Sequence, residues 1–249
     1  MPARMHSEYL RKLILNNDLA EGHYHVGDKA IAVSDIRAPI FAVGTEDDQF
    51  APWHIRDATM RPLDGKVALV VGVANAHSIA AGCAQAFADA GAKVALTYVN
   101  ENAKPNVQPV ADAVGAELLL PLDVEAEDEM EAVFAALKDK CGRIDILAHS
   151  IAFCPADDLH GRVTDCSRAG FTRAMDISVH SLIRMARLAE PLMTQGGTIL
   201  TMTYYGGEKV VDHYNIVGPV KAALEGTMRS LAVELGGQKT ASMRSLRGR

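Results

Sequence analysis

Several features of membrane, secreted or nucleic-acid-binding proteins are absent from this sequence. No run of roughly eighteen or more apolar residues occurs, so no segment is long enough to span a bilayer as a helix. The N-terminus lacks a basic segment leading into an apolar one, the pattern of a secretory signal. The four cysteines include no C-x-x-C pair, which favours free thiols in a reducing cytoplasm over disulfides. A formal net charge of −6 argues against nucleic acid and anionic membrane surfaces as partners.

Metal-ligating clusters are also scarce. His23 and His25 are separated by one residue, but no cysteine or third histidine lies nearby in the sequence. A solvated loop is therefore a better interpretation than a metal site, and we expect no metal.

From residue 66 onward, apolar strand-like runs alternate with helix-like stretches. The strand-like runs are Val67–Val71, Lys93–Tyr98, Glu117–Leu120, Ile144–Ala148 and Thr198–Thr203. The helix-like stretches are Ser78–Ala90, Val107–Val114, Ala126–Lys140, Phe171–Met193 and Tyr214–Leu235. This alternation predicts right-handed βαβ crossovers and a doubly wound parallel sheet, a Rossmann-like α/β fold with strand order 3-2-1-4-5.

The turn after the first strand-like run has the character of a nucleotide-binding turn. Gly72 ends the apolar run, and Ser78 precedes a helix of small residues. A serine cap would leave backbone N–H groups free to meet a pyrophosphate. The stretch is not G-x-G-x-x-G, so ordinary punctuation between a strand and a helix remains an alternative.

Two tyrosines and a lysine near the C-terminal end form the second candidate site. Tyr204 and Tyr214 lie ten residues apart, and Lys221 follows Tyr214 by seven. If Tyr214 opens a helix, Lys221 returns to the same face roughly 10 Å along it. A phenol that can donate a hydrogen bond beside an ammonium group suits hydride transfer. The alternative is an amphipathic helix that happens to carry these residues.

These two signals together carry a family resemblance. From about Arg61 to Gly236 the chain resembles bacterial NADH-dependent enoyl-acyl-carrier-protein reductases, a branch of the short-chain dehydrogenase/reductase superfamily. The matching pieces are GVANAHSIAAG, LDV, AHSIAF, MTYYG and YNIVGPVK. The Tyr-x6-Lys spacing is the specific element, because most members of the superfamily carry Tyr-x3-Lys and Gly218 stands at that position here. A dehydrogenase acting on alcohols or ketones is therefore the weaker alternative.

The resemblance implies an activity and a set of site residues. The family transfers hydride from NADH to a trans-2-enoyl thioester carried on acyl carrier protein, in fatty-acid biosynthesis, and works as a cytoplasmic homotetramer. Tyr214 would donate to the developing enolate, with Tyr204 nearby or merely lining the pocket, and Lys221 would hold the nicotinamide ribose. The resemblance assigns Gly72, Val73, Ser78 and Ile79 to the pyrophosphate turn, Asp123 and Val124 to the adenine, and Ser150 and Ile151 to the adenosine ribose and nicotinamide side. Asp123 could alternatively cap the helix that begins near Glu125.

The sequence after the second strand-like run bears on the choice of cofactor. It reads TYVNEN, with no arginine or lysine to meet a 2′-phosphate, and Val99 replaces the polar residue usual in the family. This favours NADH over NADPH.

Both ends of the chain depart from the family. Residues 1–60 resemble the C-terminal part of a polyhydroxyalkanoate synthase, an α/β-hydrolase-fold enzyme with a Cys-Asp-His triad. Asp48 falls at the triad aspartate, but Gln49 follows where histidine is usual and no nucleophile elbow is present, so we interpret the segment as a remnant.

At the other end, the basic tail 237–249 has neither strand alternation nor an apolar helical stripe, and we expect it to be disordered. The reductase domain, 61–236, would then stop after its fifth strand and the following helix, leaving an exposed sheet edge and an open pocket. A fusion product of weak or no activity is therefore an alternative to a working reductase.

Overall fold

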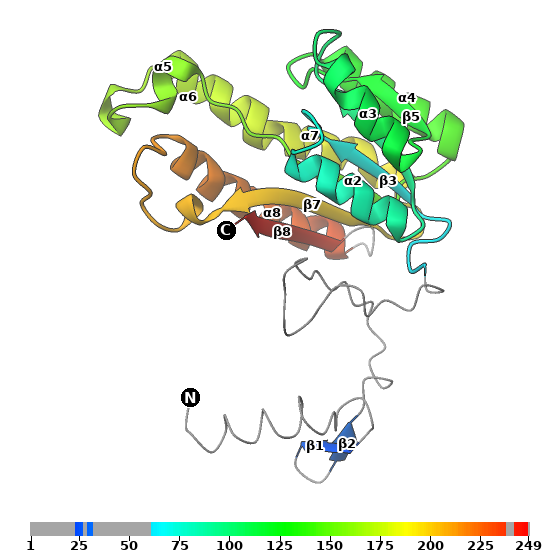
Figure 1. The fold of residues 1–249 in the computed structure, drawn as a ribbon. Coiled ribbons are helices and arrows are strands. Elements are labelled where there is room, and N and C mark those ends of the chain that lie inside the picture. Colours follow the sequence, from blue (N-terminus) through cyan, green and yellow to red (C-terminus); the bar gives the residue numbers. More distant parts are fainter. Residues whose placement is uncertain (1–22, 27–28, 32–60, 238–241, 249) are drawn as a thin grey trace. The chain divides into compact units, whose positions relative to one another are not determined.

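The structure, a computed structural model, describes residues 23–26, 29–31, 61–237 and 242–248 (Figure 1). The chain divides into two compact units, Met1–Asp57 and Ala58–Arg249. In the first unit, β1 (Tyr24–Val26) pairs antiparallel with β2 (Lys29–Ile31).

The segment AVGTEDDQ, which contains Asp48 and Gln49, lies outside the described residues. The likeness of residues 1–60 to a polyhydroxyalkanoate synthase therefore stays a prediction.

A parallel sheet organises the second unit. Among the described residues it has six strands in the order β5-β4-β3-β6-β7-β8. The strands are β3 (Val67–Val71), β4 (Lys93–Tyr98), β5 (Leu118–Pro121), β6 (Ile146–His149), β7 (Thr198–Tyr204) and β8 (Ser242–Gly248). The order of the first five is the one predicted, and the doubly wound α/β class is confirmed. The strand order reverses at β3: β4 and β5 follow on one side of it, and β6 and β7 on the other. Ligands of such folds bind outside the carboxyl ends of the strands at this point.

Helices follow the strands along the chain. They are α2 (Ile79–Asp89), α3 (Lys104–Val114), α4 (Glu127–Cys141), α5 (Ala156–Leu159), α6 (Arg168–Met175), α7 (Ser181–Ala189) and α8 (Val217–Gly237). Shorter helical turns are η3 (Val163–Asp165), η4 (Asp176–His180), η5 (Glu190–Leu192) and η6 (Tyr205–Gly207). Within the described residues, no helix is both long and apolar enough to cross a bilayer.

The position of β3 in the interior of the sheet explains why its sequence is apolar throughout. Ala68 and Val70 belong to the core cluster that contains side chains of α2 and α3. Val67, Leu69 and Val71 belong to the opposite cluster, which contains side chains of α4, α7 and α8. Because successive side chains of a strand point to opposite faces and both faces are covered, every residue of β3 is buried.

The tail beyond α8 differs from its expected state. Ser242–Gly248 forms strand β8, which pairs in parallel with β7 along seven residue positions. The expectations of a disordered tail and of an exposed β7 edge were therefore wrong. The reason is that an edge strand can be held by backbone hydrogen bonds to its neighbour, which leave no periodic apolar pattern in the sequence.

Two helices also differ from their predicted extents. The predicted stretch Phe171–Met193 is divided, since the π-helical turn η4 separates α6 from α7. The last helix begins at Val217, so Tyr214 lies in the turn before it rather than on its first turn. The argument that Tyr214 and Lys221 share one helical face is corrected accordingly.

Candidate active site

The turn after β3 approaches the end of β6 closely. Gly72 has φ +96°, and a Cβ atom built there would lie 2.1 Å from the Ser150 carbonyl oxygen. The Ser150 N–H donates to the Val71 carbonyl oxygen at 3.0 Å. Only glycine fits this position, both for its backbone conformation and for the space available. The structure thus brings together two segments that the sequence assigned to one nucleotide site.

The start of α2 is built as the sequence predicted. Ser78 caps the helix: its Oγ accepts from the Ala81 N–H at 3.3 Å and donates to the Asn75 carbonyl at 2.7 Å. Val73, within the turn, is buried, whereas Ile79 is 60% exposed. The first turn of α2 therefore has a capped end with an exposed face, the arrangement that accepts a pyrophosphate.

The loop after β5 holds Asp123 and Val124. The Asp123 carboxylate accepts from the Glu125 N–H at 3.0 Å, and the Asp123 N–H donates to the Glu129 carboxylate at 2.6 Å. The residue that caps α4 is Ala126, so Asp123 stabilises the loop rather than the helix end. This removes the helix-cap alternative and leaves Asp123 at the carboxyl edge of the sheet.

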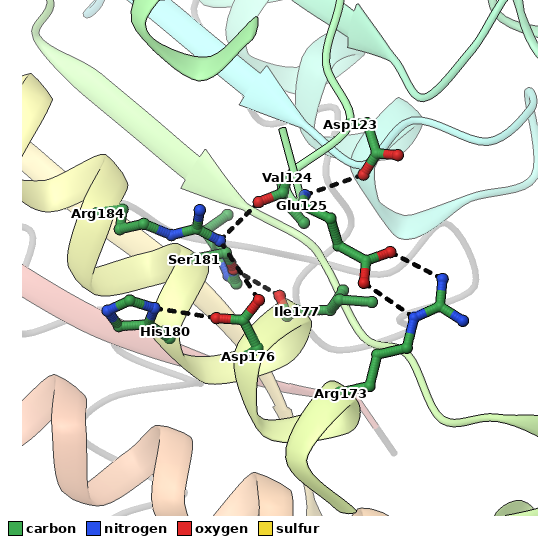
Figure 2. Close-up of polar contacts among 10 residues, drawn as sticks. Asp123, Val124, Glu125, Arg173, Asp176, Ile177, His180, Ser181 and Arg184 are labelled. Carbon is green, nitrogen blue, oxygen red and sulfur yellow. Dashed lines mark hydrogen bonds and ion pairs between the residues drawn. The ribbon is translucent and has the colours of Figure 1, made fainter. Parts of the chain in front are cut away.

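Figure 2 shows the side chains that hold this loop against α6, η4 and α7. The Val124 carbonyl accepts from Arg184 Nη2 at 2.6 Å. Glu125 forms a two-point ion pair with Arg173, with N–O distances of 2.9 and 2.8 Å. A surface hollow lies beside this pair, lined by Glu125, Arg168, Ala169, Thr172, Arg173 and Asp176. The hollow adjoins the Asp123–Val124 loop and does not include Tyr214.

His149, the last residue of β6, is completely buried in a hydrogen-bonded chain. Ser181 Oγ donates to the Ile177 carbonyl at 2.6 Å, so it accepts from His149 Nε2 at 2.8 Å. Nε2 therefore carries the proton, and Nδ1 accepts from Thr201 Oγ1 at 3.1 Å. Burial, with the charge of Lys221 as a second cause, lowers the pKa of His149 to about 3. The residue is a neutral structural link between β6, β7 and α7.

The two tyrosines meet at the carboxyl end of β7. Their rings stand edge to face, with centroids 5.1 Å apart and an interplanar angle of 61°. A Cβ atom on Gly206 would lie 2.5 Å from the Tyr214 ring, so the ring lies directly against the backbone of η6. Burial, and then the proximity of Tyr204, raises the pKa of the Tyr214 phenol.

Lys221 projects from α8 toward the same strand end. Its side chain is buried, and Nζ donates to the Met202 carbonyl at 2.7 Å. Burial lowers the pKa of the ammonium group, while the carboxylate of Glu225 opposes that shift. Tyr204, Tyr214 and Lys221 therefore all gather around the end of β7 and η6, although Tyr214 and Lys221 do not share one helix face as the sequence analysis had expected.

Some supporting residues were missed by the sequence reasoning. Ser178, in the π-helical turn, accepts from the Phe153 N–H at 2.9 Å and so holds the segment after Ile151. Ser178 and Ser181 are both buried, and hydroxyl side chains on the buried face of a helix are the signal that could have found them. Asn215 lies in the motif YNIVGPVK, but the sequence analysis assigned it no role. Among the described residues, no group of three or more His, Cys, Asp and Glu side chains is arranged to hold a metal ion.

Comparison with known proteins identifies related chains. The family model described as enoyl-(acyl carrier protein) reductase matches residues 72–241. The NADH enoyl-acyl-carrier-protein reductase 1 of Rhizobium meliloti is 49% identical over 174 residues, covering 70% of this chain and 64% of the relative. A NADH-dependent relative from Nostoc is 44% identical over 182 residues, covering 72% and 70%. The chain thus spans about two thirds of the length of these relatives.

Solved structures agree with the sequence relatives. The enoyl-acyl-carrier-protein reductase of Anaplasma phagocytophilum in complex with NAD is 42% identical, with a TM-score of 0.72 over 75% of this chain and 71% of that one. The Bacillus cereus enzyme, solved with NADP+ and an indole naphthyridinone, is 44% identical, with a TM-score of 0.70 over 74% and 72%. The family model matches more than half of the length of this chain. The chain therefore belongs to the enoyl-acyl-carrier-protein reductase family.

Proposed function

We propose that this chain reduces trans-2-enoyl thioesters with NADH, the thioester being carried on acyl carrier protein. The observation that carries the proposal is the gathering of Tyr214, Tyr204 and Lys221 at the carboxyl end of β7. The turns that follow β3 and β6 lie at the same edge of the sheet as the end of β7, because these three strands are parallel. A reducing cofactor and an acyl substrate would therefore meet beside the tyrosines.

The residues present fit a dinucleotide. A Cβ atom at Gly72 would fill the close approach between the two turns, and the exposed first turn of α2 offers N–H groups for a pyrophosphate. Val73, Ser78 and Ile79 complete this turn. Asp123 and Val124 would meet the adenine, and Ser150 and Ile151 the adenosine ribose and nicotinamide side. When bound, NADH supplies the hydride.

The protein's own groups would stabilise the charge that develops on the substrate. Reduction at the β-carbon of an enoyl thioester places negative charge on the thioester oxygen. Tyr214, whose phenol is protonated at neutral pH, would donate a hydrogen bond to that oxygen as the charge grows. Lys221 would hold the ribose hydroxyls and add a positive field from its buried position. Tyr204 would support the Tyr214 ring through their edge-to-face contact.

The preference for NADH rests on the residues after β4. The fold itself admits either cofactor, since the related Bacillus cereus structure holds NADP+. In this chain Glu101 accepts from the Tyr98 hydroxyl at 2.7 Å and lies 3.7 Å from Lys104 Nζ. A carboxylate there would repel a 2′-phosphate and occupies the nearby ammonium group. A homotetramer and a cytoplasmic location, expected from the resemblance, belong to the same proposal.

The test is NADH oxidation with a trans-2-enoyl thioester, followed by loss of absorbance at the nicotinamide band. Tyr214→Phe should lower kcat by at least tenfold, because the donor to the enolate is lost. Tyr205→Phe is the matched control: it removes the same hydroxyl from a neighbouring tyrosine that is 52% exposed, and turnover should be unchanged. Equal turnover by Tyr214→Phe and the parent chain would contradict the proposal.

The sequence-based alternative is a chain of weak or no activity. It predicts that NADH binds, measured by the change in protein or cofactor fluorescence, while no thioester is reduced. That combination of results would favour the alternative, whereas turnover that depends on Tyr214 would exclude it.

A further inference from the structure

Tyr214 lies in an irregular turn between two residues with left-handed backbones. His213 has φ +62° and Asn215 has φ +39°. The Tyr214 N–H donates to the Val211 carbonyl at 3.2 Å, and the Tyr214 carbonyl accepts from the Val217 N–H at 3.0 Å. These two bonds are local, joining Tyr214 to the turn and to the first residue of α8. A tie between this turn and a distant part of the fold requires a further contact.

The side chain of Asn215 provides such a contact. Its Nδ2 donates to the Asp158 carbonyl at 2.8 Å, across 57 residues of sequence. Asp158 is itself fixed, since its carboxylate accepts from the Ser167 N–H at 2.6 Å and from Ser167 Oγ at 2.9 Å. Ser167 in turn caps α6. The turn that carries Tyr214 is thereby tied through one amide group to the beginning of α6.

A gain in folding stability does not explain why the Asn215 amide is present. Asn215 Oδ1 is buried and has no hydrogen-bond partner among the described residues. A buried acceptor without a partner destabilises the folded state and offsets much of what the Nδ2 contact contributes. The asparagine at this position is therefore better explained by where it places its neighbour.

The ring of Tyr214 is supported separately from its backbone. Tyr204 contacts it edge to face, and Gly206 lies under it with no room for a side chain. The ring thus lies on β7 and η6, while its backbone is tied to the loop containing Asp158. With both supports, the phenol oxygen has one position; with the ring support alone, the turn can shift relative to β7.

We propose that Asn215 is a positioning residue for Tyr214, holding the phenol in its reactive place through the hydrogen bond from its side-chain amide to the Asp158 carbonyl. The inference rests on the proposed function, in which Tyr214 donates to the substrate oxygen. A displacement of about 1 Å in a reacting group can cost about 100-fold in rate. We therefore expect loss of the amide to lower kcat by roughly 10- to 100-fold while NADH binding stays within about twofold.

Two substitutions separate the amide from the backbone conformation. Asn215→Gly keeps the left-handed backbone at no steric cost but removes the amide. Asn215→Asp keeps the size and the tolerance for that backbone, and places carboxylate oxygens against a carbonyl. Both variants should show the loss of kcat, with circular dichroism confirming that each is folded. His213→Gly is the matched control: it removes an exposed side chain with the same backbone conformation on the other side of Tyr214, and kcat should stay within about twofold.

A second measurement separates this inference from the proposed function. The absorbance of the ionised phenol, titrated in the parent chain and in Tyr214→Phe, gives the pKa of Tyr214 by difference. In Asn215→Gly that pKa should fall toward its ordinary value, because the phenol is less firmly held in its buried position. If the parent chain reduces no thioester, the proposed function fails, and this titration alone decides on Asn215.

The outcomes that would overturn the inference are specific. Asn215→Gly with the parent's kcat and an unchanged phenol titration would show that the amide positions nothing. A tenfold loss of NADH affinity together with a lower melting temperature would assign Asn215 to general folding instead. Loss of kcat or a lowered phenol pKa, in a folded protein that binds NADH normally, supports it.

Discussion

Single residues in this chain are set by burial as much as by their chemistry. Lys221 and His149 are both buried and positively charged or chargeable, and each has a lowered pKa. Both donate a hydrogen bond to a neighbouring oxygen, Met202 O and Ser181 Oγ respectively. Each of these buried groups thus has a hydrogen-bond partner that carries no charge. The charged Lys221 can therefore lie close enough to the neutral His149 imidazole to affect its pKa.

The buried imidazole predicts a loss of stability in mild acid. His149 is neutral in the folded state until about pH 3, whereas the unfolded chain binds the proton near the ordinary pKa of 6.5. Between those values the unfolded state holds one more proton, so the free energy of unfolding falls as pH drops, by up to about 1.4 kcal/mol per pH unit. Above the ordinary pKa the titration of this residue adds no pH dependence to the free energy of unfolding. Urea unfolding from pH 8 to 4.5 measures the slope.

His149→Gln provides the comparison, because a glutamine can keep one hydrogen bond and does not titrate in this range. Its free energy of unfolding should be lower at neutral pH but should fall less steeply below pH 6.5. Identical slopes in both proteins would show that His149 takes up its proton while folded.

The carboxylate at the end of β4 predicts the cofactor preference. Glu101 lies 3.7 Å from Lys104 Nζ, and the Lys104 ammonium lies over the Tyr98 ring, 5.2 Å from its centroid. Glu101→Gln removes a negative charge and frees the ammonium to meet a 2′-phosphate. We expect NADPH to bind about five- to tenfold more tightly and NADH to change little, measured by fluorescence titration at low salt.

Glu117→Gln is the control for net charge, since it removes an exposed carboxylate from the amino end of the sheet. Tighter NADPH binding by this control as well would assign the effect to overall charge. No gain by Glu101→Gln would place the 2′-position elsewhere.

At the scale of elements, one buried carboxylate ties β3 to β6 at their amino ends. Asp145, directly before β6, accepts from Lys66 Nζ at 3.0 Å, from the Val67 N–H at 2.9 Å and from Arg143 Nε at 3.0 Å. These strands form the centre of the sheet, and both candidate nucleotide turns follow them. The alignment of the two turns at the opposite edge depends on this register.

Asp145→Ala should therefore destabilise the whole unit. It leaves a backbone N–H unpaired in the interior and two cations without their partner, for which we expect a loss of about 3 kcal/mol in the free energy of unfolding. Asp145→Asn retains one acceptor and should lose about half as much. Denaturant unfolding followed by circular dichroism measures both, and equal small losses would mean that water replaces the carboxylate.

At the scale of the whole molecule, β8 forms one edge of the described sheet. It pairs with β7, whose other neighbour is β6, so β7 becomes an interior strand. A chain shortened to end at Gly237 would expose the β7 backbone as a new edge. We expect a lower unfolding midpoint and self-association that grows with concentration, measured by light scattering.

Removal of Arg249 alone is the control, because that residue follows the end of β8. If the shorter chain has the same midpoint and association state as this control, pairing by β8 contributes nothing to the stability of the sheet.

The sequence by itself determined the class of fold and most of the candidate site. Strands such as β3, covered on both faces, must be apolar throughout, and this pattern is readable without coordinates. Gly72 and Ser78 were recognisable because a close backbone approach demands glycine and a helix start favours serine. Tyr214 and Lys221 were identified by their spacing in the motif. This was possible because the proposed chemistry depends directly on these two side chains.

Only the tertiary structure decided how these residues are held. The contact from Asn215 to Asp158 and the hydrogen bond between Ser178 of η4 and Phe153 both join segments distant in sequence. The strand β8 depends likewise on the edge that β7 offers. Local patterns record which face of an element is apolar, but they do not record which backbone groups find partners across the fold. Those partners are chosen by packing, and they fix the position of each reactive group.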